Sequence, residues 1–90
     1  MNRTEYLDVA AHTITKDREE EYGRPEVSFN RIADLWSAYL RTRLDAKDVA
    51  LMMILLKVAR AKNGAHRDDT YVDIAGYAAL AGELMTTPEE

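Results

Sequence analysis

Several residue types that commonly hold small domains together are rare or missing in this sequence. It has no cysteine, two prolines and four glycines among 90 residues. Without cysteine, neither a disulfide nor a thiolate metal site can brace the fold. With so little glycine, a phosphate-binding loop of the P-loop kind is excluded. Stability must therefore come from side-chain packing, within the chain or between copies of it.

Long apolar runs and an excess of basic residues are missing too. The longest apolar run, 49–56, covers eight residues, far fewer than the roughly 20 of a membrane-spanning helix. The N-terminus lacks the apolar core of a secretory signal. A net charge of −4 argues against general DNA or RNA binding, which needs a basic surface. We therefore expect a cytoplasmic protein with no membrane and no nucleic-acid partner.

Strand patterns are absent, and helical spacing fits most of the chain. We predict an all-α single domain, 1–90, with four helices at about 4–22, 26–43, 46–63 and 69–86. Asp45, followed by Asp48 three residues later, is typical of a helix N-terminus. Gly23 and Pro25 separate the first two helices, and Gly64 is expected just past the end of the third.

The third and fourth predicted helices are apolar nearly all round rather than along one stripe. Such helices are buried on most sides. A chain of this length has little else to cover them, since it buries only about 60–65% of its unfolded surface. We therefore expect an obligate homo-oligomer with these helices at or near the interface.

Charged residues interrupt the apolar faces of the predicted helices. If the last loop turns near residue 66, Lys57 and Arg60 lie level with Asp73 on the next helix. This pattern indicates either a polar ligand pocket or a buried ion pair that fixes helix register. The residues that we predict to bind ligand are Asp17, Arg18, Glu21, Tyr22, Asn30, Trp36, Lys57, Arg60, Asp73 and Tyr77.

Metal chemistry is limited by the side chains present. Two histidines are too few and too far apart for a zinc site. Asp69 and Asp73 share a helix face at a spacing of four, and Mg²⁺ needs only one or two carboxylates together with substrate phosphates. Magnesium therefore stays open as a cofactor, although the leading interpretation needs none.

Three stretches carry a resemblance to a known family: DREEEYGRPEVSFNRIADLW, DVALMMILLKVAR and HRDDTYVDIAGYA. From Asp17 to Met85 the chain resembles a family of small phage and prophage helical proteins. That resemblance implies a location in the cytoplasm of the host cell.

The chain is more distantly similar to all-α nucleoside triphosphate pyrophosphohydrolases of the MazG type. That family holds Mg²⁺ with an E-x-x-E pair on one helix and an E-x-x-D pair on the next. Asp69 and Asp73 resemble the second pair at a spacing of four. Where the first pair belongs, this chain has Lys57 and Arg60. The resemblance implies a MazG-like bundle whose nucleotide pocket has lost most of its metal ligands.

Basic side chains bind phosphate directly, so the leading hypothesis is a binding protein. It would sequester a nucleotide-derived, phosphate-bearing small molecule, such as a signal of host defence. Lys57, Arg60 and Arg18 would contact phosphate. Asn30 and Asp73 would recognise ribose or base edges, while stacking would fall to Tyr22, Trp36 or Tyr77.

Two alternatives come from other classes of protein. One is a Mg²⁺-dependent, MazG-like pyrophosphohydrolase in which Asp69 and Asp73 hold the metal with Asp17 and Glu21. The other is a structural oligomerisation module, in which the charges only set helix register.

Overall fold

The computed structural model describes residues 1–17, 20 and 23–85, and in these ranges the protein is all-helical. Within these ranges lie four α-helices and one π-helical segment: α1 (Arg3–His12), η1 (Thr13–Asp17), α3 (Pro25–Leu40), α4 (Ala46–Asn63) and α5 (Asp68–Met85). The predicted all-α fold is confirmed there. Within the same ranges, no helix combines the length and hydrophobicity that a bilayer span requires.

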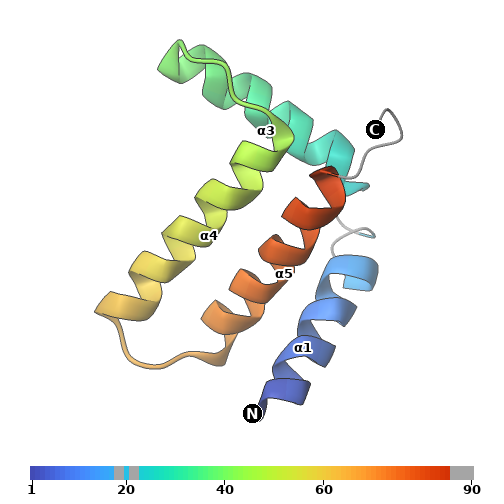
Figure 1. Ribbon diagram of the computed structural model, residues 1–90, viewed down its shortest axis with the longest axis vertical. Coiled ribbons are helices and arrows are strands. Elements are labelled where there is room, and N and C mark those ends of the chain that lie inside the picture. The colour runs from blue at the N-terminus through green and yellow to red at the C-terminus, as the bar shows by residue number, and fades with distance from the viewer. Residues whose placement is uncertain (18–19, 21–22, 86–90) are drawn as a thin grey trace.

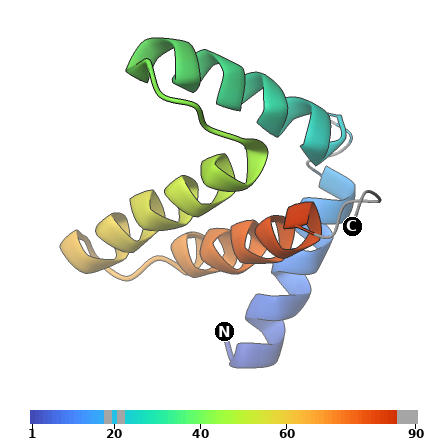
Figure 2. The same ribbon diagram turned by 45° about the horizontal axis from the view of Figure 1, so that its top comes forward.

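Helices α4 and α5 form an antiparallel hairpin on which the other helices pack. Helix α1 packs against α5, and α3 crosses the hairpin where α4 begins and α5 ends (Figures 1 and 2). The buried core lies at this crossing and consists of Phe29, Ala33, Ala46, Val49, Ala50, Tyr77, Leu80 and Ala81. At the opposite end of the hairpin, where α4 turns into α5, most side chains are polar and exposed.

The start of α4 is fixed by a capping box. The Asp45 carboxylate accepts the backbone N–H of Asp48 at 2.8 Å, and the Asp48 carboxylate accepts that of Asp45 at 3.0 Å. Such caps contribute about 1 kcal/mol. The helix ends at Asn63 with Gly64 next. Both predicted ends of this helix are confirmed.

The first helix is not the continuous element predicted for 4–22. It ends at His12, and Thr13–Asp17 follows as a wider π-helical turn. Three β-branched residues in a row, at 13–15, crowd a regular helix. The Thr15 hydroxyl also donates to the Ala11 carbonyl at 2.7 Å, a bond that bends helices. The predicted end at residue 22 lies outside the described residues.

The second helix ends at Leu40, three residues before the predicted boundary at 43. Arg41 takes the left-handed conformation, with φ 55°. The Ser37 hydroxyl then accepts the Leu44 backbone N–H at 2.8 Å. The hydrogen bond of Ser37 stabilises a helix end at which glycine is usually found. Because the segment contains no glycine, its composition did not predict that the helix ends here.

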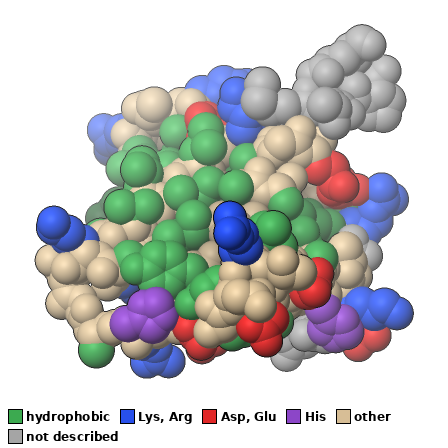
Figure 3. All heavy atoms as spheres, turned by 60° about the horizontal axis from the view of Figure 1, so that its bottom comes forward, with side chains coloured by type: hydrophobic (Ala, Val, Ile, Leu, Met, Phe, Trp, Pro, Cys, Tyr) green, Lys and Arg blue, Asp and Glu red, His purple; other side chains and the backbone are tan. Residues whose placement is uncertain are grey.

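Many large apolar side chains remain exposed. Figure 3 shows a broad hydrophobic area on one face, with charged side chains around it and one basic side chain near its middle. On α4 the exposed apolar side chains are Leu51, Met52, Leu55, Leu56 and Val58. The expectation that the third helix is buried on most sides is therefore not met within a single chain.

Candidate functional site

A lysine–aspartate pair joins the two arms of the hairpin. The Nζ atom of Lys57 on α4 lies 2.9 Å from Oδ2 of Asp73 on α5. The two side chains are only 15% and 28% exposed. This contact confirms the prediction from hairpin register that Lys57 and Asp73 lie at the same height on the two helices. Each charge is partly removed from water, and each compensates the other.

Beside this pair the surface forms a polar hollow of about 590 Å³. The end of α4, the loop that follows and the first turns of α5 enclose it. Its lining consists of Lys57, Arg60, Asn63, Gly64, Ala65, Arg67, Asp69, Thr70 and Asp73. Three cations and two carboxylates give this lining a formal charge of +1, in a chain whose net charge is −4. The hollow is therefore locally suited to an anion.

Two arginines of this hollow have guanidinium groups that are available to donate hydrogen bonds to a ligand. In the part of the chain that the structure describes, Arg60 has no carboxylate within ion-pair distance. Arg67 Nη2 lies 3.8 Å from Asp69 Oδ2, and both side chains are largely exposed, so this pair is weak. Helix α5 also begins here, and the N–H groups of its first turn favour an anion.

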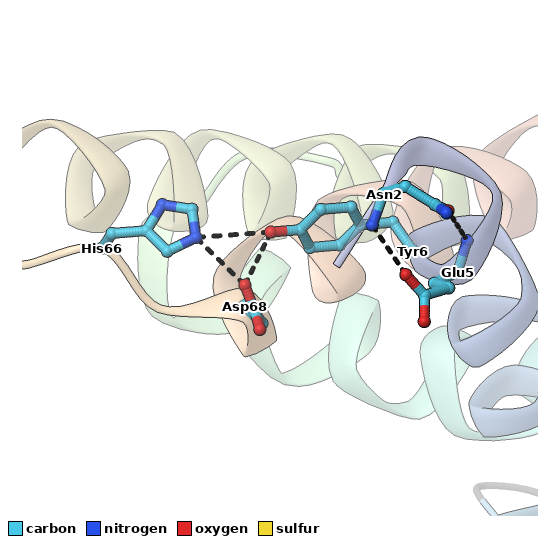
Figure 4. A network of polar contacts seen from close by, with 5 residues as sticks. All are labelled: Asn2, Glu5, Tyr6, His66 and Asp68. Atoms are coloured by element: carbon cyan, nitrogen blue, oxygen red, sulfur yellow. Dashed lines mark hydrogen bonds and ion pairs between the residues drawn. The ribbon is translucent and has the colours of Figure 1, made fainter.

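On the other side of the same loop, three side chains form a polar network (Figure 4). Tyr6 on α1 donates its hydroxyl to Asp68 Oδ1 at 2.6 Å. His66 Nε2 lies 3.0 Å from that oxygen and 3.3 Å from the Tyr6 hydroxyl. The bond from Tyr6, and then the contact with His66, lower the pKa of the Asp68 carboxyl. The Asp68 bond raises the pKa of Tyr6. The network ties α1 to the start of α5.

Aromatic rings lie next to this network. The His66 ring stacks on Tyr71 at a centroid distance of 5.3 Å, and Tyr6 meets Tyr71 edge-on at 6.2 Å. With Arg3 and Leu7 they line an open, mainly apolar hollow of about 460 Å³. The loop thus separates a polar hollow from an aromatic one.

Three of the predicted ligand-binding residues lie away from the polar hollow. Asn30 is exposed on α3 and donates its amide to the Glu26 carbonyl at 2.6 Å. Trp36 packs half-buried against the core. Tyr77 is 8% exposed, with its ring 6.2 Å from that of Phe29. The structure therefore does not bring these three side chains together with Lys57 and Arg60.

Four other predicted ligand-binding residues are not described, or are described only in part. Arg18, Glu21 and Tyr22 lie outside the described residues, and only the backbone of Asp17 is described. Asp69 and Asp73 both line the polar hollow. Among the described side chains, no three histidine or carboxylate groups gather closely enough to hold a metal ion.

Sequence reasoning missed three polar residues of the hollow: Asn63, Arg67 and Thr70. They lie in or next to the turn, where they interrupt no apolar stripe. The register argument that matched Lys57 with Asp73 could have found them, because it also places residues 63–70 around the same end of the hairpin.

Comparisons with known proteins place the chain in a family. A family model described as a domain of unknown function, DUF6378, matches residues 5–85. The chain is 45% identical over 85 residues to the Gene 55 protein of Mycobacterium phage L5. It is 38% identical over 84 residues to the Gene 55 protein of Mycobacterium phage D29.

Both alignments cover 93% of this chain, but only 54% and 56% of those relatives. The chain therefore spans about half the length of the curated relatives that it matches. No solved structure matches it. Since the family model covers most of the sequence, the chain belongs to the DUF6378 family, which includes phage proteins.

Proposed function

We propose that the polar hollow binds a phosphate-bearing small molecule of the nucleotide class, without a metal ion. The observation that carries the proposal is the grouping of Lys57, Arg60 and Arg67 around one hollow. Its volume of about 590 Å³ falls within the range of roughly 300–1,000 Å³ that is usual for small-molecule sites.

The side chains of the hollow divide into phosphate-binding and hydroxyl-binding groups. The planar guanidinium groups of Arg60 and Arg67 suit bidentate contacts with phosphate oxygens. Lys57 adds a point charge that Asp73 holds in place. Asn63 and Thr70 offer neutral donors, and the carboxylates of Asp69 and Asp73 can accept hydrogen bonds from ribose hydroxyls or base N–H groups.

Sequestration is the activity that we propose for such a site. Tight binding lowers the free concentration of a small molecule without any reaction, so the site needs no nucleophile and no metal cage. The family includes phage proteins, and phages gain from removing nucleotide signals that host cells use in defence. This biological role rests on analogy, whereas the class of ligand rests on the chemistry of the hollow.

Calorimetry in the presence of EDTA tests the proposal. The ligands would be pyrophosphate, ATP, ADP-ribose and a cyclic dinucleotide. We expect at least one to bind, and Arg60→Gln to weaken it about tenfold or more because a charge-assisted contact is lost. Arg31→Gln, the same change at an exposed site on α3, should leave binding intact. No binding by any of the four, or equal losses in both variants, would contradict the proposal.

A Mg²⁺-dependent, MazG-like pyrophosphohydrolase is the second candidate. It is favoured by Asp69 and Asp73, which lie one helical turn apart on the same hollow. Mg²⁺ needs few protein carboxylates when the substrate brings phosphates. Pyrophosphate release that requires Mg²⁺ and is lost in Asp73→Asn would favour this enzyme over a binding protein. Absence of release with any nucleoside triphosphate would exclude it.

A further inference from the structure

The face of α4 that points away from the core is apolar for about two turns. Leu51, Leu55 and Val58 recur at helical spacing along this face, and they are 43%, 68% and 48% exposed. Ala59 follows Leu51 and Leu55 at a spacing of four, while Met52 and Leu56 lie to one side of that row. Among the residues that the structure describes, none covers this surface, which we name the α4 outer face.

The exposed area of the chain is larger than that of a compact monomer of the same mass. The chain exposes 6666 Å², whereas a compact monomer of 10.2 kDa exposes about 5,300 Å². The difference exceeds the roughly 800 Å² that each partner buries in a standard interface. Covering the α4 outer face would bring the exposed area toward the value expected for a folded subunit.

The charges that end this face are arranged for pairing with a second copy. Asp48 lies seven residues before Leu55, and Lys62 lies seven residues after it. A two-fold axis at Leu55 would make the helices antiparallel and set Asp48 opposite Lys62 of the partner subunit. The same register sets Leu51 against the small Ala59 of the partner subunit, which permits close packing.

We propose that a second copy of this chain docks on the α4 outer face, with the two α4 helices antiparallel about a two-fold axis at Leu55. Such an interface is self-complementary, as two-fold symmetry requires. It lies apart from the polar hollow, because Lys57 points toward α5 and pairs with Asp73. This inference is independent of the ligand.

The oligomeric state in solution tests the docking. Light scattering after gel filtration should give twice the chain mass for the wild type and a single chain mass for Leu55→Glu, since a charge cannot be buried unpaired in an apolar contact. Leu7→Glu, at a residue of α1 that is 63% exposed, should remain a dimer. A monomeric wild type, or a dimer that survives Leu55→Glu, would overturn the proposal.

Cysteine cross-linking tests the register. Because the chain has no cysteine, a single introduced one can form a disulfide only between chains. Leu55→Cys should cross-link on oxidation, since the axis passes beside it. Leu51→Cys should not, because the two residues would lie about 12 Å apart along the helices, beyond disulfide reach. Equal cross-linking at both positions, or none at residue 55, would refute the two-fold register.

Discussion

Lys57 and Asp73 show how one contact can serve both the fold and a site. Their side chains are mostly buried, and the pair spans the hairpin at the edge of the hollow. Bringing both charges out of water costs free energy, which their attraction offsets. Removing one partner leaves the other charge poorly solvated, whereas removing both leaves an apolar contact.

A double-mutant cycle measures this coupling. We expect Lys57→Met alone to lower the free energy of unfolding by about 1–2 kcal/mol, because Asp73 loses its partner. Adding Asp73→Leu should restore most of the loss. Urea unfolding at one protein concentration gives the values. A harmless single substitution, or strictly additive losses, would show that the pair contributes little to stability.

The network of Tyr6, His66 and Asp68 predicts a response to acid. Its hydrogen bonds hold the pKa of Asp68 below the ordinary value of 3.8. The stability that this carboxylate contributes is therefore complete above pH 3.8 and is lost as the pH falls through the lowered pKa. In Tyr6→Phe the main cause of the shift is gone, so unfolding midpoints measured between about pH 5 and pH 2 should fall less than in the wild type. Parallel curves for the two proteins would contradict this assignment.

At the scale of elements, the contact between η1 and α5 depends on a glycine. A Cβ atom on Gly76 would lie 2.9 Å from Cγ2 of Ile14, which is too close. On Gly82, in the same helix, it would meet nothing within 4 Å. The two glycines are therefore a matched pair for separating close packing from helix propensity.

Alanine at these positions should have opposite effects. Gly82→Ala should stabilise the protein by about 0.5–1 kcal/mol, the propensity gain in a helix interior. Gly76→Ala should destabilise it by about 1 kcal/mol or more, because displacing Ile14 outweighs that gain. Thermal unfolding at matched protein concentration compares them. Two stabilised variants would mean that η1 does not pack as closely on α5 as described.

The elements were predictable where local chemistry marks them. Asp45 and Asp48 mark the start of α4, and their side chains satisfy the first N–H groups as expected. The π-helical turn at Thr13–Asp17 was not predictable from apolar spacing, because a single turn of this kind shifts the spacing by only one residue. The early end of α3 rests on Ser37, whose bonds to Leu44 depend on the path of the following loop.

For the molecule as a whole, the sequence predicted which residues of two neighbouring helices lie at the same height. It predicted less well which residues line one pocket. Hairpin register correctly placed Lys57 next to Asp73, because the short loop between α4 and α5 limits how the two helices can be aligned. Apolar stripes indicate which side of a helix faces inward but not where helices cross. Trp36 and Tyr77 therefore lie with the core near the α3 crossing, whereas the cations gather at the other end of the hairpin.

The most direct test of the central claim is a titration of the protein with pyrophosphate in EDTA, followed by ¹H–¹⁵N NMR of backbone and arginine side-chain N–H groups. We predict saturable shifts confined to the guanidinium groups of Arg60 and Arg67 and to backbone amides of residues 63–70. Shifts centred instead on the separate hollow that Asn30 and Arg41 line, or no saturable shift at millimolar pyrophosphate, would contradict a phosphate site at the turn of the hairpin.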